Sequence, residues 1–221
     1  MSRIKRSTDE LEAIRREIMG QALELIVAEG YEGFSMRKLA ARLGIAAKTI
    51  YNFFRDKDEL YIAVLSQGFE QLLAHHESAV EHLVEPVERL RAAIRSFVEF
   101  GLEQANVYNI MFTWNVPKYY DYVGTEMEPA ARLELDTAMK YTESLSGCIA
   151  ACASPSLAVS ETAIRHELIL VWSAMHGFVA GVNNTLLLYL TSDPASLKDL
   201  VVDRVTRNTV RALSLLEKER S

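Results

Sequence analysis

The segment from residue 35 to residue 57 constrains the fold of this chain more than any other stretch. A helical pattern over 35–43 is followed by a short turn that begins with Gly44, and a second helical pattern starts at once over 47–54. Two short helices joined by a turn of three or four residues that contains glycine are typical of a helix-turn-helix. The sequence therefore predicts this motif within the first part of its 221 residues.

The charge of this segment differs in sign from the charge of the whole chain. Residues 35–57 carry six basic side chains and one acidic side chain, whereas the whole chain has a net charge of −6. A basic patch on an otherwise acidic protein is suited to contact with phosphate groups. We therefore predict that the segment binds nucleic acid, although two packing helices with a solvated basic face would give the same charge and periodicity.

Helical patterns dominate the rest of the chain, and alternating strand patterns are nearly absent. Ser7 and Glu10 form a capping-box pattern at the start of the first helix, and Gly30 is placed to end it after Glu29. We predict an all-α fold with two domains, a three-helix helix-turn-helix domain over 1–60 and a helical bundle over 61–221. Further helices are expected over 57–82, 86–104, 128–153, 157–190 and 194–217, with an irregular aromatic segment over 106–123.

Patterns for catalysis, metal binding or membrane insertion are not apparent. Cys148 and Cys152 lie four residues apart on one helical face, where a disulfide fits poorly and no histidine completes a metal site. The adjacent His75 and His76 are expected at the surface. The uncharged stretch between Glu167 and Asp193 contains several polar side chains, which favours a buried helix over a membrane span. We expect a cytoplasmic protein that lacks a signal peptide, is not an enzyme and uses no cofactor or metal.

The second helix of the motif carries the candidates for reading base edges. In a helix-turn-helix this helix lies in the major groove, with its N-terminal residues against the bases. Those positions are held by Ala47, Lys48 and Thr49. Lys48 can donate to guanine or to phosphate, and the Thr49 methyl group can contact a thymine methyl group.

A second set of residues is suited to phosphate, which fixes position without specifying sequence. Ser35 can cap the first helix of the motif, and the N-terminus of that helix with Arg37 nearby suits a phosphate group. The remaining candidates for phosphate contact are Tyr51, Asn52 and Lys57.

The first 60 residues or so resemble the TetR family of bacterial repressors. The resemblance is carried by Gly30–Gly33, Ser35–Ala40, Gly44-Ile45, Thr49–Phe54 and Lys57–Leu60. Ala46 departs from the family pattern, which commonly has a capping serine there, and Arg55 stands where proline is frequent. The resemblance places Tyr51 and Lys57 at phosphate-contacting positions, and it implies that the rest of the chain is a helical domain for ligand binding and dimerisation.

Candidate ligand-pocket residues follow one stripe of the helix expected over 157–190. The stripe combines a large aromatic side chain, an imidazole and an amide with apolar side chains, as ligand pockets do. The aromatic segment could supply the opposite wall. The candidates are Trp172, His176, Val179 and Asn183 on the stripe, and Tyr108, Met111, Phe112 and Trp114 opposite. Residues 172–178 also resemble the Trp…His-Gly signature of one TetR subgroup, although His176 could equally be a core histidine bonded to a backbone carbonyl.

The opposite stripe of this helix is built from small residues, which lets another helix approach closely. We assign it, with the last helix beside it, to the interface between two subunits in a four-helix bundle. Tight packing within one subunit is the alternative. The interface candidates are Ser173, Gly177, Gly181, Thr185, Leu188, Val201 and Val205.

These expectations combine into a homodimeric regulator of transcription. The expected partners are double-stranded DNA, a second copy of the chain and an unidentified small-molecule effector, and no membrane. A small hydrophobic ligand would release the dimer from a palindromic operator by changing the spacing of the two recognition helices. The alternatives are a DNA-bound adaptor that recruits a protein partner and needs no small molecule, and an enzyme or carrier that uses the same helical cavity.

Overall fold

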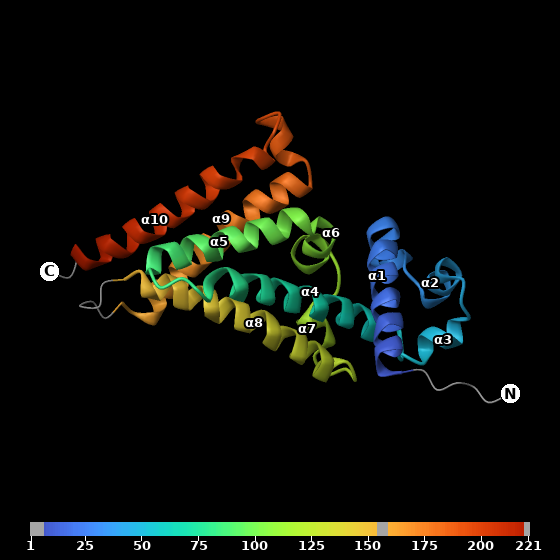
Figure 1. Cartoon of the computed structure of the whole chain (residues 1–221). Coiled ribbons are helices and arrows are strands. Elements are labelled where there is room, and N and C mark those ends of the chain that lie inside the picture. The colour runs from blue at the N-terminus through green and yellow to red at the C-terminus, as the bar shows by residue number, and fades with distance from the viewer. Residues whose placement is uncertain (1–6, 154–158, 219–221) are drawn as a thin grey trace. The chain divides into compact units, whose positions relative to one another are not determined.

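The computed structural model describes residues 7–153 and 159–218, with side chains up to Leu215. Every regular element within these ranges is helical, and no strand occurs in them. The all-α fold with an N-terminal helix-turn-helix and a larger helical domain is thereby confirmed. Two compact units form (Figure 1): the first unit contains residues up to Gly68 together with Trp114–Leu135, and the second contains Phe69–Thr113 together with the residues from Asp136 onward.

The helix-turn-helix lies in the first unit. It consists of α1 (Thr8–Gly33), α2 (Met36–Leu43) and α3 (Ala47–Tyr51), which are followed by the start of α4 (Lys57–Val80). The unit also contains α7 (Tyr119–Tyr122) and the start of α8 (Glu128–Ala151). The predicted domain boundary lay at residue 60, whereas the first unit continues to Gly68 and includes a distant segment of the chain.

Local signals in the sequence explain the ends of these helices. Ser7 and Glu10 form the predicted capping box of α1, and the Ser35 hydroxyl accepts from the Lys38 N–H at 3.3 Å to cap α2. Gly44 ends α2 in the left-handed conformation, at φ 66°. The predicted break after Glu29 is present, although α1 as a whole extends to Gly33. Gly30 interrupts the helix at φ 74°, but helical geometry resumes and continues to Gly33.

The core of the first unit is built from one apolar face of each helix. Ile18 and Ile26 of α1, Leu39 of α2 and Ile50 of α3 are almost completely buried, as is Phe54, which follows α3. Burial of a large apolar side chain contributes about 1.5–3 kcal/mol. The short α3 lacks a side-chain cap, as the sequence predicts from Ala46, so its position depends on packing through Ile50.

The second unit contains the longest helices of the chain. α5 (Pro86–Glu103) packs against α9 (Glu161–Asn183) and α10 (Lys198–Lys218), and α9 and α10 also pack on each other (Figure 1). α6 (Ala105–Tyr108) and a π-helical turn (Asn109–Thr113) follow α5, so the segment predicted to be irregular is mostly helical. The latter parts of α4 and α8 also belong to this unit. Among the described helices, none has the length and apolar character required to cross a membrane.

Two expectations for the second unit were wrong. The long helix does not reach Leu190, because α9 ends at Asn183 and Thr185 adopts the left-handed conformation at φ 61°. The predicted start of this helix, at residue 157, lies outside the described residues. His76 is not a surface residue. It is fully buried, and its Nε2 lies 2.8 Å from the Ser144 hydroxyl of α8, a partner that sequence spacing cannot reveal.

Candidate functional site

The second helix of the motif places its predicted base-reading residues differently with respect to solvent. Lys48 is exposed, whereas Ala47 and Thr49 are half-buried. Ile50, fully buried, anchors the helix from behind. The arrangement leaves the N-terminal turn of α3 accessible and gives it one long, positively charged side chain.

The basic side chains near the motif fall into two groups. Lys38 pairs with Glu29 and Arg42 pairs with Glu24, so each is held by an acidic residue of α1. Arg37 and Lys48 are exposed and form no ion pair within the described part of the chain. Exposed ion pairs contribute little stability, and a phosphate group can compete for such a lysine or arginine. Arg37 and Lys48 are available without that competition.

The predicted phosphate contacts Tyr51, Asn52 and Lys57 surround the end of α3. Tyr51 and Asn52 are exposed. The Lys57 ammonium group lies over the Tyr31 ring, 3.9 Å from its centroid, which is a cation–π contact. The Tyr31 hydroxyl donates to Asp58, and burial together with this hydrogen bond raises the pKa of Tyr31, so the hydroxyl keeps its proton.

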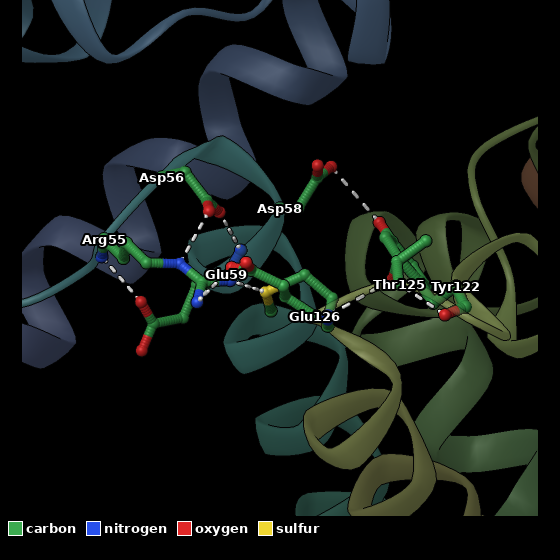
Figure 2. Close-up of polar contacts among 8 residues, drawn as sticks. Arg55, Asp56, Asp58, Glu59, Tyr122, Thr125 and Glu126 are labelled. Carbon is green, nitrogen blue, oxygen red and sulfur yellow. Dashed lines mark hydrogen bonds and ion pairs between the residues drawn. The ribbon is translucent and has the colours of Figure 1, made fainter.

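A segment from the middle of the chain completes the first unit at the start of α4. The Tyr122 hydroxyl donates to the same Asp58 oxygen at 3.3 Å, and the Tyr61 hydroxyl donates to the Pro117 carbonyl oxygen at 3.0 Å. Figure 2 shows Asp58 and Tyr122 together with a second contact, in which the Arg55 guanidinium group lies 3.3 Å from the Glu126 carboxylate. Sequence reasoning missed this docking, because no local pattern links residues about 60 positions apart.

The second unit brings together part of the predicted pocket. His176 stacks on Trp172 with 4.6 Å between ring centroids and an interplanar angle of 6°, and its Nδ1 lies 2.6 Å from the Tyr108 hydroxyl. Phe112 contacts Tyr108, Trp172 and His176. Burial lowers the pKa of His176, which favours the neutral imidazole. His176 is therefore bonded to a phenol rather than to the backbone carbonyl of the alternative interpretation.

The other pocket candidates lie apart from this ring stack or are enclosed. Asn183 donates to the Gly101 carbonyl oxygen at 2.8 Å, and Val179 packs so closely on Gly101 that a Cβ there would lie 2.6 Å from Val179 Cγ1. Met111 is buried. Trp114 belongs to the first unit, whereas the seven other candidates belong to the second.

A hollow of about 420 Å³ lies between α8 and α9 in the second unit. Most of its walls are apolar, and they include Trp172 and Tyr141. Tyr141 is buried, and its hydroxyl has no hydrogen-bond partner among the described residues. No local pattern distinguishes Tyr141 in the sequence, and its place in the wall of this hollow is seen only in the folded chain. The full lining is Tyr141, Thr142, Leu145, Leu168, Ile169, Trp172 and Ser173.

The predicted interface residues divide between exposed and enclosed positions. Ser173 and Gly177 are exposed on α9, and a Cβ at Gly177 would meet no atom within 4 Å. Gly181 is buried instead, because Leu187 of the same chain covers it at 2.8 Å from an added Cβ. Thr185 and Leu188 are exposed beyond the end of α9. On α10, Val201 and Val205 are half-buried.

The fold and these sites define a class: helix-turn-helix proteins with a larger helical unit. Residues 18–64 match the family described as bacterial regulatory proteins, tetR family, and residues 90–205 match the tetracyclin repressor-like C-terminal domain. The chain belongs to the tetR family. The second match covers about half of the chain by itself and includes most of α5.

The chain is similar in sequence to a curated regulator of transcription. The chain is 31% identical over 123 residues to the HTH-type transcriptional activator FasR of Mycolicibacterium smegmatis, a match that covers 56% of this chain and 53% of that protein. It thus spans about half the length of this curated relative.

Solved structures share the fold at low identity. FadR of Bacillus subtilis in complex with stearoyl-CoA has a TM-score of 0.65 and 16% identity, with 86% of this chain and 97% of that chain covered. AibR in complex with isovaleryl coenzyme A and operator DNA has a TM-score of 0.60 and 20% identity, with 75% and 85% covered. At these identities the likeness supports the fold alone.

Proposed function

We propose that this chain is a dimeric, DNA-binding regulator of transcription whose second unit binds a fatty acyl-CoA or a related hydrophobic effector. The single observation that carries the DNA-binding part is the exposure of Lys48 on α3, with Arg37 exposed on α2 and neither held by an acidic residue within the described part of the chain. An exposed recognition helix with free cationic side chains suits the major groove, whereas two packing helices need no such freedom.

DNA recognition follows from this placement. Lys48 would donate to a guanine edge or a phosphate, and the half-buried Ala47 and Thr49 would lie close to the bases. Arg37, Tyr51 and Lys57 would contact phosphates on either side, which fixes the orientation of α3. A dimer would place two recognition helices about 34–36 Å apart, in successive major grooves of a palindromic operator.

The effector class is proposed from the hollow and from the relatives. A volume of about 420 Å³ lies within the usual size range of ligand pockets, and the walls between α8 and α9 are mostly apolar. Two proteins of the same fold were solved with acyl-CoA molecules, as described above, and an acyl chain suits such walls.

The dimer is proposed to form through α9 and α10. Leu170 is 62% exposed on α9, and Gly177 lies two turns later on the same side of the helix, whereas the neighbouring Ile169 and Ser173 also border the hollow. Large exposed apolar side chains next to small residues favour close packing of a second helix. Two helices from each subunit would then form a four-helix bundle.

Two finer points stay predictions. Release by the ligand is our preferred direction of regulation, although the relative FasR is described as an activator. The resemblance of residues 172–178 to the Trp…His-Gly subgroup has a geometric counterpart in the stacked Trp172 and His176, but the matched families do not test it. A DNA-bound adaptor without a small-molecule ligand is the second candidate, and it predicts no response to acyl-CoA.

The test starts with selection of bound sequences from random duplex DNA at physiological salt. Enrichment of a palindrome supports a dimeric, sequence-specific regulator, and Lys48→Ala should reduce the enrichment. Lys140→Ala is the matched control, because Lys140 is an exposed lysine of α8 in the second unit. Stearoyl-CoA and isovaleryl-CoA then serve as effector probes on the selected duplex. No enrichment by the folded wild-type protein would refute the DNA-binding proposal.

A further inference from the structure

A short chain of contacts connects Lys57, a predicted phosphate contact, with a segment that lies far from it in the sequence. Lys57 is half-buried, and its ammonium group lies over the Tyr31 ring at 3.9 Å from the centroid. A lysine side chain is flexible and loses rotamer freedom when it must hold one geometry. A ring beneath the ammonium group limits that freedom before DNA arrives. The position of the Tyr31 ring therefore determines where Lys57 points.

Asp58 holds the Tyr31 ring in place through the tyrosine hydroxyl group. The Tyr31 hydroxyl donates to Asp58 Oδ1, and the Tyr122 hydroxyl donates to the same oxygen at 3.3 Å. Burial raises the pKa of both tyrosines, so that both hydroxyl groups remain donors. A carboxylate oxygen can accept both hydrogen bonds at once. Asp58 thereby joins a tyrosine of α1 to a tyrosine of α7.

Further contacts hold the same two surfaces together. Tyr61 packs edge-on against Tyr31 with 4.8 Å between ring centroids, and its hydroxyl donates to the Pro117 carbonyl oxygen. Arg55 contacts Glu126 (Figure 2). It also donates to Met127 Sδ at 2.6 Å. The segment from Pro117 to Met127 is thus attached at three places to the stretch from Arg55 to Tyr61, which includes the start of α4. All of these residues belong to the first unit.

We propose that Asp58 and Tyr122 are positioning residues for DNA binding, which act by fixing the Tyr31 ring under Lys57. The inference rests on the proposed DNA-binding function and adds to it a part of the chain outside the helix-turn-helix. It makes operator affinity depend on Tyr122, 65 residues after Lys57. A merely structural role for the cluster would change the stability of the unit and leave the direction of Lys57 unaffected.

The first experiment needs no DNA. Protons held over the face of an aromatic ring are shielded, so the Lys57 ε-methylene resonances should lie upfield of those of exposed lysines in the NMR spectrum of the full chain. Tyr122→Phe should move them toward the ordinary position, because the ring loses one of its anchors. Tyr120→Phe is the matched control, since Tyr120 is 86% exposed on the same short helix. Unchanged Lys57 resonances in a folded Tyr122→Phe variant would overturn the proposal.

The second experiment is a double-mutant cycle on the selected operator duplex. Tyr122→Phe removes one hydroxyl and no charge, and we expect it to weaken binding about two- to tenfold, the range for loss of one hydrogen bond. Lys57→Ala should weaken binding and reduce the salt dependence by about one counterion. In the Lys57→Ala background, Tyr122→Phe should cost nothing further. An equal loss in both backgrounds, or no loss in either, would contradict the assigned role.

Asp58→Ala provides a second variant whose expected sign separates positioning from simple charge. Removal of a negative charge beside DNA strengthens binding by electrostatics alone, whereas loss of the acceptor for two hydroxyl groups should weaken it. A weakened Asp58→Ala variant with an unchanged thermal midpoint supports the positioning role, and a strengthened one refutes it. Wild-type binding to the selected duplex is measured alongside. Failure of the wild type to bind would refute the proposed function itself. Wild-type binding together with unchanged binding by every variant would refute only this inference.

Discussion

Glu134 gives the first unit a stability that should depend on pH. This carboxyl group of α8 is 8% exposed, and burial raises its pKa from 4.5 to about 7, although nearby Lys118 acts to lower it. Between these two values the folded chain holds a proton that the unfolded chain releases. The group therefore stabilises the fold at low pH, and this contribution is lost as pH rises through about 7.

The size of the effect follows from the pKa difference. One pKa unit corresponds to about 1.36 kcal/mol, so the shift from 4.5 to about 7 corresponds to about 3 kcal/mol as an upper bound. Glu134→Gln keeps the shape and polarity of the protonated acid without ionising. At pH 4, below the pKa of the unfolded chain, the variant should be about as stable as the wild type, and at pH 8 it should be more stable by about 1–3 kcal/mol.

The assay is urea unfolding of both proteins at several pH values, followed by circular dichroism. The difference between the two free energies of unfolding isolates Glu134, because other titrating groups contribute equally to both. Glu143→Gln is the matched control, since Glu143 is an exposed carboxylate of the same helix. A constant difference between pH 4 and pH 8, or a Glu134→Gln variant that loses stability at pH 8, would refute the reasoning and indicate that Glu134 is charged and paired with Lys118.

Three further predictions concern the DNA contact and the second unit. Lys48→Ala should weaken operator binding by about 1–3 kcal/mol and leave the thermal midpoint unchanged, as measured by fluorescence anisotropy and calorimetry. Gly101→Ala should destabilise the chain, because its Cβ would lie 2.6 Å from a Val179 methyl group. The clash costs about 1–3 kcal/mol, from which about 1 kcal/mol of gained helix propensity is subtracted. Gly147→Ala, whose Cβ meets no atom within 4 Å, should stabilise the chain in the same urea assay. Tyr141→Phe should raise the thermal midpoint of the protein in calorimetry, because it removes a buried hydroxyl group that has no partner among the described residues.

The helix-turn-helix could be predicted from the sequence because its signals are local. The serine cap at Ser35, the glycine at Gly44 and the buried Ile50 act within a few residues of each other, and each lies where the pattern places it. The exposure of Lys48 follows from the same periodicity. Local propensity and tertiary packing agree in this segment, and agreement between the two levels makes a fold readable from its sequence.

Contacts between distant residues account for what the sequence could not reveal. His76 is buried because Ser144, 68 positions later, satisfies its Nε2. Tyr122 joins the first unit through Asp58, a carboxylate that a sequence pattern would place simply in the first turn of α4. A buried polar side chain needs a partner, and the identity of that partner depends on the fold rather than on neighbouring residues.

The small residues of α9 show where a periodic pattern stops being informative. Gly177 and Gly181 are one turn apart and look equivalent in the sequence, yet one is open to solvent and the other is covered by Leu187. The difference arises because Thr185 reverses the chain direction just after α9 and brings Leu187 back onto the helix. Gly181 therefore serves close packing within the chain. Gly177, on the same side of the helix as the exposed Leu170, is left as the position at which a second copy could approach closely, so the proposed interface depends on the middle of α9 rather than on its end.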